Sequence, residues 1–254
     1  PAAKFYGDLY KKDPILACDS CEKAAFLVAK DLKAIGIDWC FAPVVDVHDI
    51  KSQIIGAKHR AFSEDNKVIV DLAIAWLKGL NKAGIKGCLK HFPGHGRCEL
   101  DSHVDYPEDK RDFLSWQNDL DIYRNILDKT KLYDLDYLIM IGHMSVPNLH
   151  LGLESCKDFC YSDIAKKKKS SLGFESTQKQ NPGSEVFSPM RKESPVYSSV
   201  IIKKLLKQDL GYNGLVISDC LSMCAADAKD DYPNKIKRAH NAGCDWVIAS
   251  GFNF

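Results

Sequence analysis

The sequence predicts an α/β fold of the TIM-like (β/α)8 barrel type, incomplete in this chain. Short apolar segments that suit buried strands alternate with longer segments of helical periodicity. The expected strands lie near residues 44, 89, 139, 216 and 246, and each ends in a polar residue or glycine, as strands do at the functional rim of a barrel. Five strands are fewer than the eight of a closed barrel, so we expect strands to be missing at one or both ends.

The composition favours a cytoplasmic globular protein. The 254 residues are 45% hydrophobic and 27% charged, and 35 basic side chains balance 34 acidic ones. A net charge of +1 gives no electrostatic reason to expect nucleic acid or a membrane as a partner. We see no signal peptide and no apolar run of membrane-spanning length, and the ten cysteines suit a reducing compartment.

The first predicted helix runs from about Ser20 to Ala34. Asp19 and Glu22 resemble a capping box at its start, and Gly36 follows its end. Its expected apolar face contains Ala24, Ala25, Leu27, Val28, Leu32 and Ile35. The apolar stretch that follows contains a proline and is too short for a buried helix, so we expect a strand ending near Asp46.

A second helix is predicted to begin at Ser63 and to end before Gly84. Its apolar face would contain Ile69, Leu72, Ala73, Trp76, Leu80 and Ala83. The strand 87–91 follows, and then a loop in which Pro93, Gly94 and Gly96 prevent regular structure and leave freedom to move. A polar helix over about 110–128 and a buried strand over 137–142 complete this half of the chain.

The amino-acid composition changes at residues 155–195, which include four consecutive lysines, Lys166 to Lys169, many serines and few apolar residues. We interpret this stretch as a solvated loop inserted into a single domain spanning residues 1–254, and its lysine run as surface rather than a binding patch. Beyond it the pattern predicts a helix at 198–209, a strand at 214–218 ending at Asp219, a helix at 233–241 and a strand at 244–249.

The richest chemistry lies between Lys90 and His103, where three histidines, a lysine and an aspartate follow a strand. Asp101 can reach His103 only if the backbone bends around Ser102. In that case the carboxylate would fix the imidazole tautomer and raise its pKa, which produces a proton donor and acceptor near neutral pH. Spacing alone favours the alternative, an exposed polar pair.

Three further side chains sit where strands end. Asp219 follows an apolar strand, where a charge is costly unless it meets hydrogen-bond donors or a ligand, although capping the next helix is an equal alternative. Lys90 and His91 offer donors to hydroxyl or phosphate oxygens, or are merely exposed.

A metal site is the competing interpretation of the same segment. His91, His95, Asp101 and His103 carry suitable zinc-binding atoms. The helical geometry of a His-x-x-x-His pair is excluded by Pro93 and the glycine after it. We therefore prefer a site without metal, and keep a metal-dependent hydrolase using His91, His95 and Asp101 as an alternative.

The motif from Lys90 to Gly96, followed after four residues by Asp101-Ser-His103, resembles the signature of glycoside hydrolase family 3 β-N-acetylglucosaminidases, the NagZ-like enzymes of bacterial cell-wall recycling. Further blocks resemble the family in the same order: Phe41 to Val47, Ile55-Gly with Arg60-Ala-Phe, Gly142-His143 and Val216 to Met223. Together the matching blocks extend from the first residues to Cys244-Asp245, apart from the stretch after Leu151.

The resemblance implies a β/α barrel and the retaining hydrolysis of terminal β-linked N-acetylglucosamine through a covalent glycosyl-enzyme intermediate. The substrate would be a muropeptide from peptidoglycan or a chitooligosaccharide. Asp219 matches the nucleophile, and His103, oriented by Asp101, matches the acid/base, in place of the usual second carboxylate. No metal and no organic cofactor is implied.

The same resemblance implies that Arg60, Lys90 and His91 hold the sugar hydroxyls, and that the loop at 93–96 lets the Asp101–His103 pair swing over the bound sugar. Two features depart from the family. Cys220 stands where the family has a second aspartate, and family members carry about two strands upstream and further sequence downstream. We expect the full gene product to be the enzyme and this segment alone to be weak or inactive.

Two other functions stay open at this level. A non-catalytic or decayed sugar-binding protein would fit the missing ends and the lysine-serine stretch, and the metal-dependent hydrolase would fit the histidines. Phosphate could replace water as the acceptor. The sequence leaves the preferred aglycone, the oligomeric state and the role of the insertion undetermined.

Overall fold

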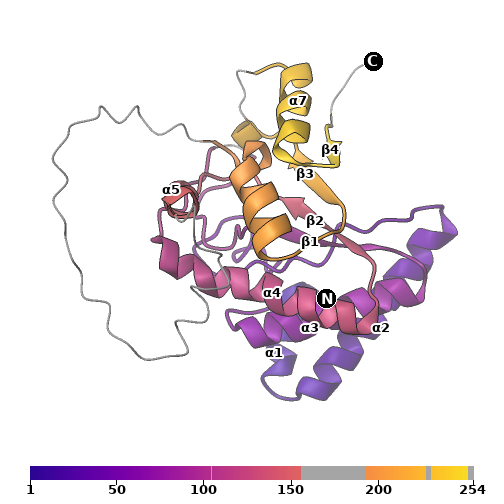
Figure 1. The fold of residues 1–254 in the computed structure, drawn as a ribbon. Coiled ribbons are helices and arrows are strands. Elements are labelled where there is room, and N and C mark those ends of the chain that lie inside the picture. The colour runs from indigo at the N-terminus through magenta and orange to yellow at the C-terminus, as the bar shows by residue number, and fades with distance from the viewer. Residues whose placement is uncertain (104, 156–192, 227–229, 251–254) are drawn as a thin grey trace, which may run out of the picture.

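A computed structural model describes residues 1–103, 105–155, 193–226 and 230–250 (Figure 1). The insertion predicted at 155–195, with its lysine run, lies almost wholly outside the described residues. Within the described part of the chain, no helix combines the length and the apolar character needed to cross a bilayer.

Four parallel strands form the central sheet: β1 (Gly87–Phe92), β2 (Tyr137–Ile141), β3 (Val216–Cys220) and β4 (Trp246–Ile248). Their order in space, β1-β2-β3-β4, is their order in the sequence. Barrels are wound in one direction in this way, whereas the strand order of a doubly wound sheet reverses at a switch point. The topology is therefore that of a barrel segment.

The strand expected near Asp46 lies beside β1 but is broken. Trp39 and Val44 form isolated parallel bridges with Lys86 and Lys90. The two bridges are five residues apart on this segment but four apart on the β1 side, so the extra residue forms a bulge that interrupts the ladder, and the N–H of Cys88 donates to the carbonyl oxygen of Ala42 at 2.8 Å between them. This segment extends the parallel sheet to five members in chain order.

The sheet is curled, because its two ends meet. The rings of Trp39, on the segment beside β1, and Trp246, on β4, lie edge to face with centroids 5.4 Å apart. Side chains inside the curl form one apolar cluster, Cys88, Leu138, Met140 and Ile217, with Trp39 and Ile248 packed against it. Their neighbours along the strands face the helices: Leu89, Ile139, Ile141 and Val216 belong to the main core. The alternation is that of strands buried on both faces.

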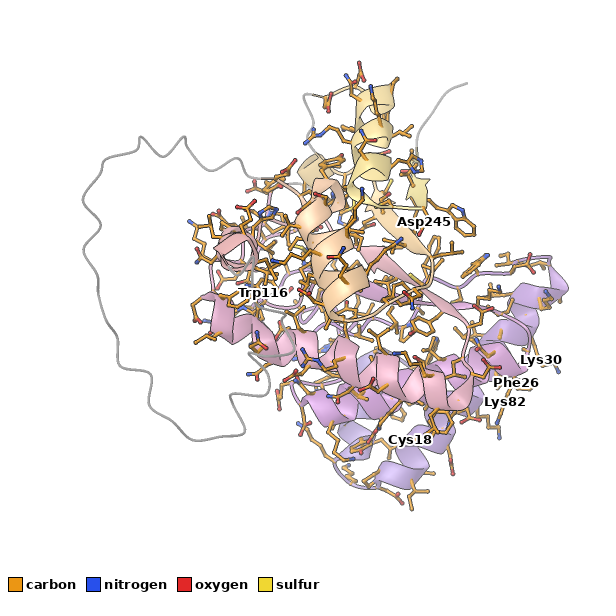
Figure 2. All side chains as sticks on the ribbon, in the orientation of Figure 1. Cys18, Phe26, Lys30, Lys82, Trp116 and Asp245 are labelled. Carbon is orange, nitrogen blue, oxygen red and sulfur yellow. The ribbon has the colours of Figure 1, made fainter. Side chains whose placement is uncertain are left out.

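Helices cover the outside of this sheet. Their bounds are α1 (Ala3–Tyr10), α2 (Pro14–Ala34), α3 (Asn66–Lys82), α4 (Trp116–Tyr133), α5 (Pro147–Ser155), the π-type helix η3 (Val200–Asp209) and α7 (Tyr232–Ala242). Figure 1 shows α1 to α4 grouped on one side of the sheet and α7 at the other end. Trp116, labelled at the start of α4 in Figure 2, is fully buried in the main core.

The first predicted helix begins earlier than expected, because a different residue caps it. The side chain of Asp13, not Asp19, accepts a hydrogen bond from the N–H of Leu16 at 3.0 Å, and Pro14 occupies the first turn of α2. The N–H groups of the first helical turn have no intrahelical acceptor, so proline, which lacks an N–H, is tolerated there and the helix starts at this position. The predicted capping box at Asp19 and Glu22 was therefore wrong.

The buried face of α2 also differs from the prediction. Ala17, Cys21, Ala25 and Ala29 are buried, whereas the larger Leu27, Val28 and Ile35 are exposed. Small residues face α3 because the two helices approach closely: a Cβ added to Gly79 of α3 would lie 2.2 Å from the carbonyl oxygen of Glu22. The positions of the large apolar residues therefore predicted the wrong buried face for this helix.

Helix α3 matches its predicted face, since Ile69, Leu72, Ala73 and Leu80 are all buried. It starts at Asn66 rather than Ser63 because Asp65 caps it, accepting from the N–H of Lys67 at 2.7 Å. Helix α4 begins about six residues later than expected, after a 3₁₀ turn over Phe113–Ser115. The predicted strands at 87 and 137 are confirmed, and helices α1 and α5 were not foreseen.

Candidate active site

Three neighbouring parallel strands deliver polar side chains to one rim. Lys90 and His91 lie near the carboxyl end of β1. His143 follows β2, and Asp219 is the last residue but one of β3. Carboxyl ends of parallel strands share one edge, so these side chains gather there. Of the predicted residues, Lys90, His91 and Asp219 are thus brought together by the sheet itself.

Asp219 is the carboxylate of this rim. It is partly buried, and one of its oxygens accepts from the N–H of Cys220 at 2.7 Å. Burial raises the pKa of Asp219, but the charges of His91 and His143 and further contributions lower it overall below its ordinary value. The carboxylate is therefore ionised at neutral pH. The next helical turn begins only at Cys224, so Asp219 is not a helix cap.

A second carboxylate, which the sequence did not single out as a site residue, lies beneath the rim. Asp46 is buried, and its Oδ2 lies 2.7 Å from Nδ1 of His91. Its Oδ1 accepts from the backbone N–H groups of His91 at 3.2 Å and His95 at 2.7 Å. Burial raises the pKa of Asp46, but the charge and hydrogen bond of His91 lower it below its ordinary value.

The loop after β1 is more firmly held than predicted. Every residue from His91 to Gly96 is buried, and the N–H of His95 is bound to Asp46. A Cβ on Gly96 would lie 2.0 Å from the carbonyl oxygen of Val47, so this glycine is needed for close packing. Burial and the hydrogen bond to Asp46 do not favour the freedom of movement expected at 93–96. Exposure begins at Glu99.

Asp101 and His103 form a hydrogen-bonded pair, as the catalytic interpretation requires. The backbone turns at Ser102, and Oδ1 of Asp101 lies 2.7 Å from Nδ1 of His103 while also accepting from its backbone N–H at 2.9 Å. Burial raises the pKa of Asp101, but the two bonds from His103 lower it overall. The His103 side chain is 60% exposed, so its ring faces solvent where a substrate can reach it.

The loop carrying this pair packs against the segment that follows Asp219. Ser102 is buried, and its carbonyl oxygen accepts from the N–H of Ala225 at 3.3 Å. Ala225 lies six residues after Asp219 in the sequence. The pair and the carboxylate therefore stand on adjoining loops of the same rim.

Arg60 and Lys90 line a common cavity of about 330 Å³. Aromatic rings form much of its wall, including Tyr6, Phe41 and Trp76. Arg60 donates to the carbonyl oxygen of Ile54 at 3.1 Å. Burial lowers the pKa of Lys90, and the neighbouring carboxylates oppose that shift. A cavity with cationic donors and aromatic walls suits a hydroxyl-rich ring such as a sugar.

His143 is a buried neighbour of Asp219 for which the sequence offered only the Gly142-His143 block. Its Nδ1 lies 2.9 Å from Oγ of Ser194. Burial lowers the pKa of His143 to about 4, so the ring is neutral at neutral pH. A strand-end histidine and a serine 51 positions later carry no shared sequence signal, so this contact could not be foreseen.

The metal alternative is not supported by the geometry. Among the described residues, no three His, Cys, Asp or Glu side chains gather as metal ligands would. His91 directs Nδ1 to Asp46, and Asp101 is turned toward His103. The His95 ring is fully buried, and burial lowers its pKa. His91, His95 and Asp101 are thus not arranged as one set of metal ligands.

Comparison with known proteins places this site in context. The sequence matches the family described as Glycosyl hydrolase family 3 N terminal domain over residues 13–175 and 184–251. A curated beta-hexosaminidase of Methylobacillus flagellatus is 32% identical over 249 residues, which cover 98% of this chain but only 58% of that relative. The chain thus spans little more than half of the relative's length.

Two solved structures of NagZ from Neisseria gonorrhoeae resemble the fold. The complex with N-trifluoroacetyl-D-glucosamine superposes with a TM-score of 0.72 at 26% identity, covering 98% of this chain and 59% of that chain. A complex of the same protein with zinc ion gives a TM-score of 0.72 at 25% identity, covering 98% and 58%.

Proposed function

Because the chain matches the N-terminal domain of glycosyl hydrolase family 3 and therefore belongs to that family, we propose that the protein is a retaining β-N-acetylhexosaminidase. The observation that carries this proposal is the pairing of an ionised strand-end carboxylate, Asp219, with the hydrogen-bonded Asp101–His103 pair on the adjoining loop. The first supplies a nucleophile and the second a route for a proton. Retaining glycoside hydrolysis requires both.

In the first step a carboxylate oxygen of Asp219 bonds to the anomeric carbon as the bond to the leaving oxygen breaks. Nε2–H of His103 gives that oxygen its proton, and Asp101 stabilises the ring through Nδ1. In the second step His103 takes a proton from water, whose oxygen displaces Asp219 from the anomeric carbon. Two inversions retain the configuration.

The substrate of this proposal is a terminal β-linked N-acetylglucosamine. Arg60 and Lys90 line the cavity of about 330 Å³, whose lining includes neither Asp219 nor His91, and together with His91 they would hold the sugar hydroxyls. The solved relative binds an N-acylated glucosamine, which supports this choice. We further propose that the natural substrate is a muropeptide or chitooligosaccharide and that the protein acts in peptidoglycan recycling in the cytoplasm.

A trapping experiment tests the proposal. The natural full-length protein is treated with a fluorinated N-acetylglucosamine analogue that forms a long-lived glycosyl-enzyme, and the adduct is mapped by mass spectrometry. We expect the label on Asp219 and none in an Asp219→Asn variant. Binding of the sugar without any label would instead support a non-catalytic sugar-binding protein.

A metal test accompanies it, because one relative has been solved with zinc. We expect turnover of an aryl N-acetylglucosaminide to survive treatment with a chelator. Activity that is lost with chelator and restored by zinc would overturn the metal-free mechanism and favour the metal-dependent hydrolase. Product analysis in phosphate buffer separates hydrolysis from phosphorolysis.

A further inference from the structure

We propose that Asp46 is a positioning residue of the active site, which determines which ring nitrogen of His91 carries the proton and holds that ring toward the substrate. The inference rests on the proposed function, in which His91 binds a sugar hydroxyl. Asp46 itself is buried and touches no substrate, so it acts through His91.

The contacts of Asp46 all converge on one segment. Its carboxylate meets three donors: Nδ1 of His91 at 2.7 Å, the N–H of His91 at 3.2 Å and the N–H of His95 at 2.7 Å. All three donors belong to His91 and His95, which lie at least 45 residues further along the chain and on one rim segment. The convergence orients that segment.

The protonation state of His91 follows from the chemistry of its partner. An ionised carboxylate only accepts hydrogen bonds, so Nδ1 of His91 must be the donor. In the neutral ring Nε2 is then bare and accepts a hydrogen bond, which suits a sugar hydroxyl. Histidine rings are commonly fixed in this way by a carboxylate on the other nitrogen.

Packing leaves the ring little room to turn away from Asp46. The His91 side chain is only 6% exposed, and its ring lies edge to face with the ring of His95, with centroids 5.8 Å apart. A Cβ added to Gly142 would lie 2.8 Å from Cβ of His91, so the residue after β2 packs closely against the base of this side chain. The ring is therefore held by contacts as well as by hydrogen bonds.

The first test uses the unmodified natural full-length protein. Nitrogen-15 NMR of labelled histidine distinguishes the two neutral tautomers, and a His91→Gln variant identifies the signal. At a pH where the ring is neutral, we expect the proton on Nδ1. A proton on Nε2 would overturn the inference. This measurement needs no turnover, so it can fail or succeed independently of the proposed glycosidase activity.

The second test is Asp46→Asn. If the amide oxygen keeps the N–H of His95, its NH₂ group faces Nδ1 of His91, and the proton must move to Nε2. We expect that tautomer change together with a fall in kcat/KM of about 100-fold, at the upper end of the 10- to 100-fold typical of groups that orient a ligating histidine and below the roughly 10⁴-fold of a tautomer error at a catalytic base.

A double-mutant comparison shows whether Asp46 acts through His91. In a His91→Gln background, we expect Asp46→Asn to lower kcat/KM by less than about threefold. Asp71→Asn is the matched control, because Asp71 also binds three donors but lies on α3, away from the rim. It should leave kcat/KM unchanged. Losses that multiply in the double variant, or an unchanged His91 tautomer in Asp46→Asn, would contradict the inference.

Discussion

The imidazole of His103 needs Asp101 beside it if it is to exchange protons during turnover. The backbone turns at Ser102 and brings the two side chains to 2.7 Å, which is the geometry that the catalytic interpretation requires. A turn of this kind depends on local backbone geometry. Spacing alone favoured an exposed polar pair, and the His103 side chain is indeed 60% exposed.

Replacing Asp101 with asparagine should therefore slow turnover. We expect Asp101→Asn to reduce kcat for a poor leaving group on the order of 10²- to 10⁴-fold, because proton transfer and the imidazole tautomer are both impaired. A nitrophenyl leaving group needs less protonation, so its glycosylation step should suffer less. The measurement is steady-state kinetics with both substrates.

Asp105→Asn is the control for this prediction, since Asp105 is an exposed carboxylate four residues along the same loop. It should behave like the unmodified protein. Equal losses for good and poor leaving groups in Asp101→Asn would show that Asp101 does not support an acid catalyst.

Residues whose partners lie far along the sequence were the ones that could not be predicted. Asp219, Lys90 and His91 were predicted as site residues because each sits where an apolar strand ends. Asp46 sits at such an end too, but nothing in the sequence indicates that its partner is His91. The position of a strand is visible from its pattern, whereas the pairing between strands depends on tertiary structure.

At the scale of elements, the apolar pattern located the helices and strands better than it located their ends. Asp13 and Asp65 cap α2 and α3, while the expected caps at Asp19 and Ser63 do not. Several candidate caps precede each helix, and packing selects among them. Face prediction failed only for α2, where small residues rather than large ones meet the neighbouring helix.

The helix layer is also joined by an ionic cluster that should respond to pH. Asp71 of α3 binds Tyr10 of α1 at 2.7 Å and Lys129 of α4 at 2.5 Å, and Lys67 contacts it as well. Burial raises the pKa of Asp71, but hydrogen bonds from Lys129, Lys67 and Tyr10 lower it to about 2.

A lowered carboxyl pKa stabilises the fold above the unfolded-state value of about 3.9, and that stabilisation disappears as the pH falls toward 2. We expect Asp71→Asn to reduce the free energy of unfolding at pH 7 by about 1 kcal/mol, a figure discounted for solvent screening. Urea denaturation at pH 7 and at lower pH measures the difference. A difference that grows on acidification would contradict this assignment.

At the scale of the whole molecule, the prediction of a TIM-like barrel fold is confirmed by the family and by the solved relatives. Counting strands from the sequence also gave the right five segments. The curl of the sheet was not predictable, because it depends on which edges meet. The contact between Trp39 and Trp246 shows that closure directly.

That contact makes a testable contribution to stability. In a double-mutant cycle with Trp39→Leu and Trp246→Leu, we expect a coupling energy of about 0.5–1.5 kcal/mol, the range for edge-to-face aromatic pairs. Thermal or urea unfolding of the four proteins provides the values. Purely additive losses would mean that the two rings stabilise the sheet independently.

The anchoring of the rim segment by Asp46 has an entropic consequence. Residues 91–98 are already held by burial and hydrogen bonds before any ligand arrives, so binding does not have to order them. Fixing a backbone residue costs roughly 1–2 kcal/mol. If a sugar binds here as proposed, the ordering cost falls on the short, more exposed stretch 99–103, so less of the interaction energy is spent on ordering the backbone.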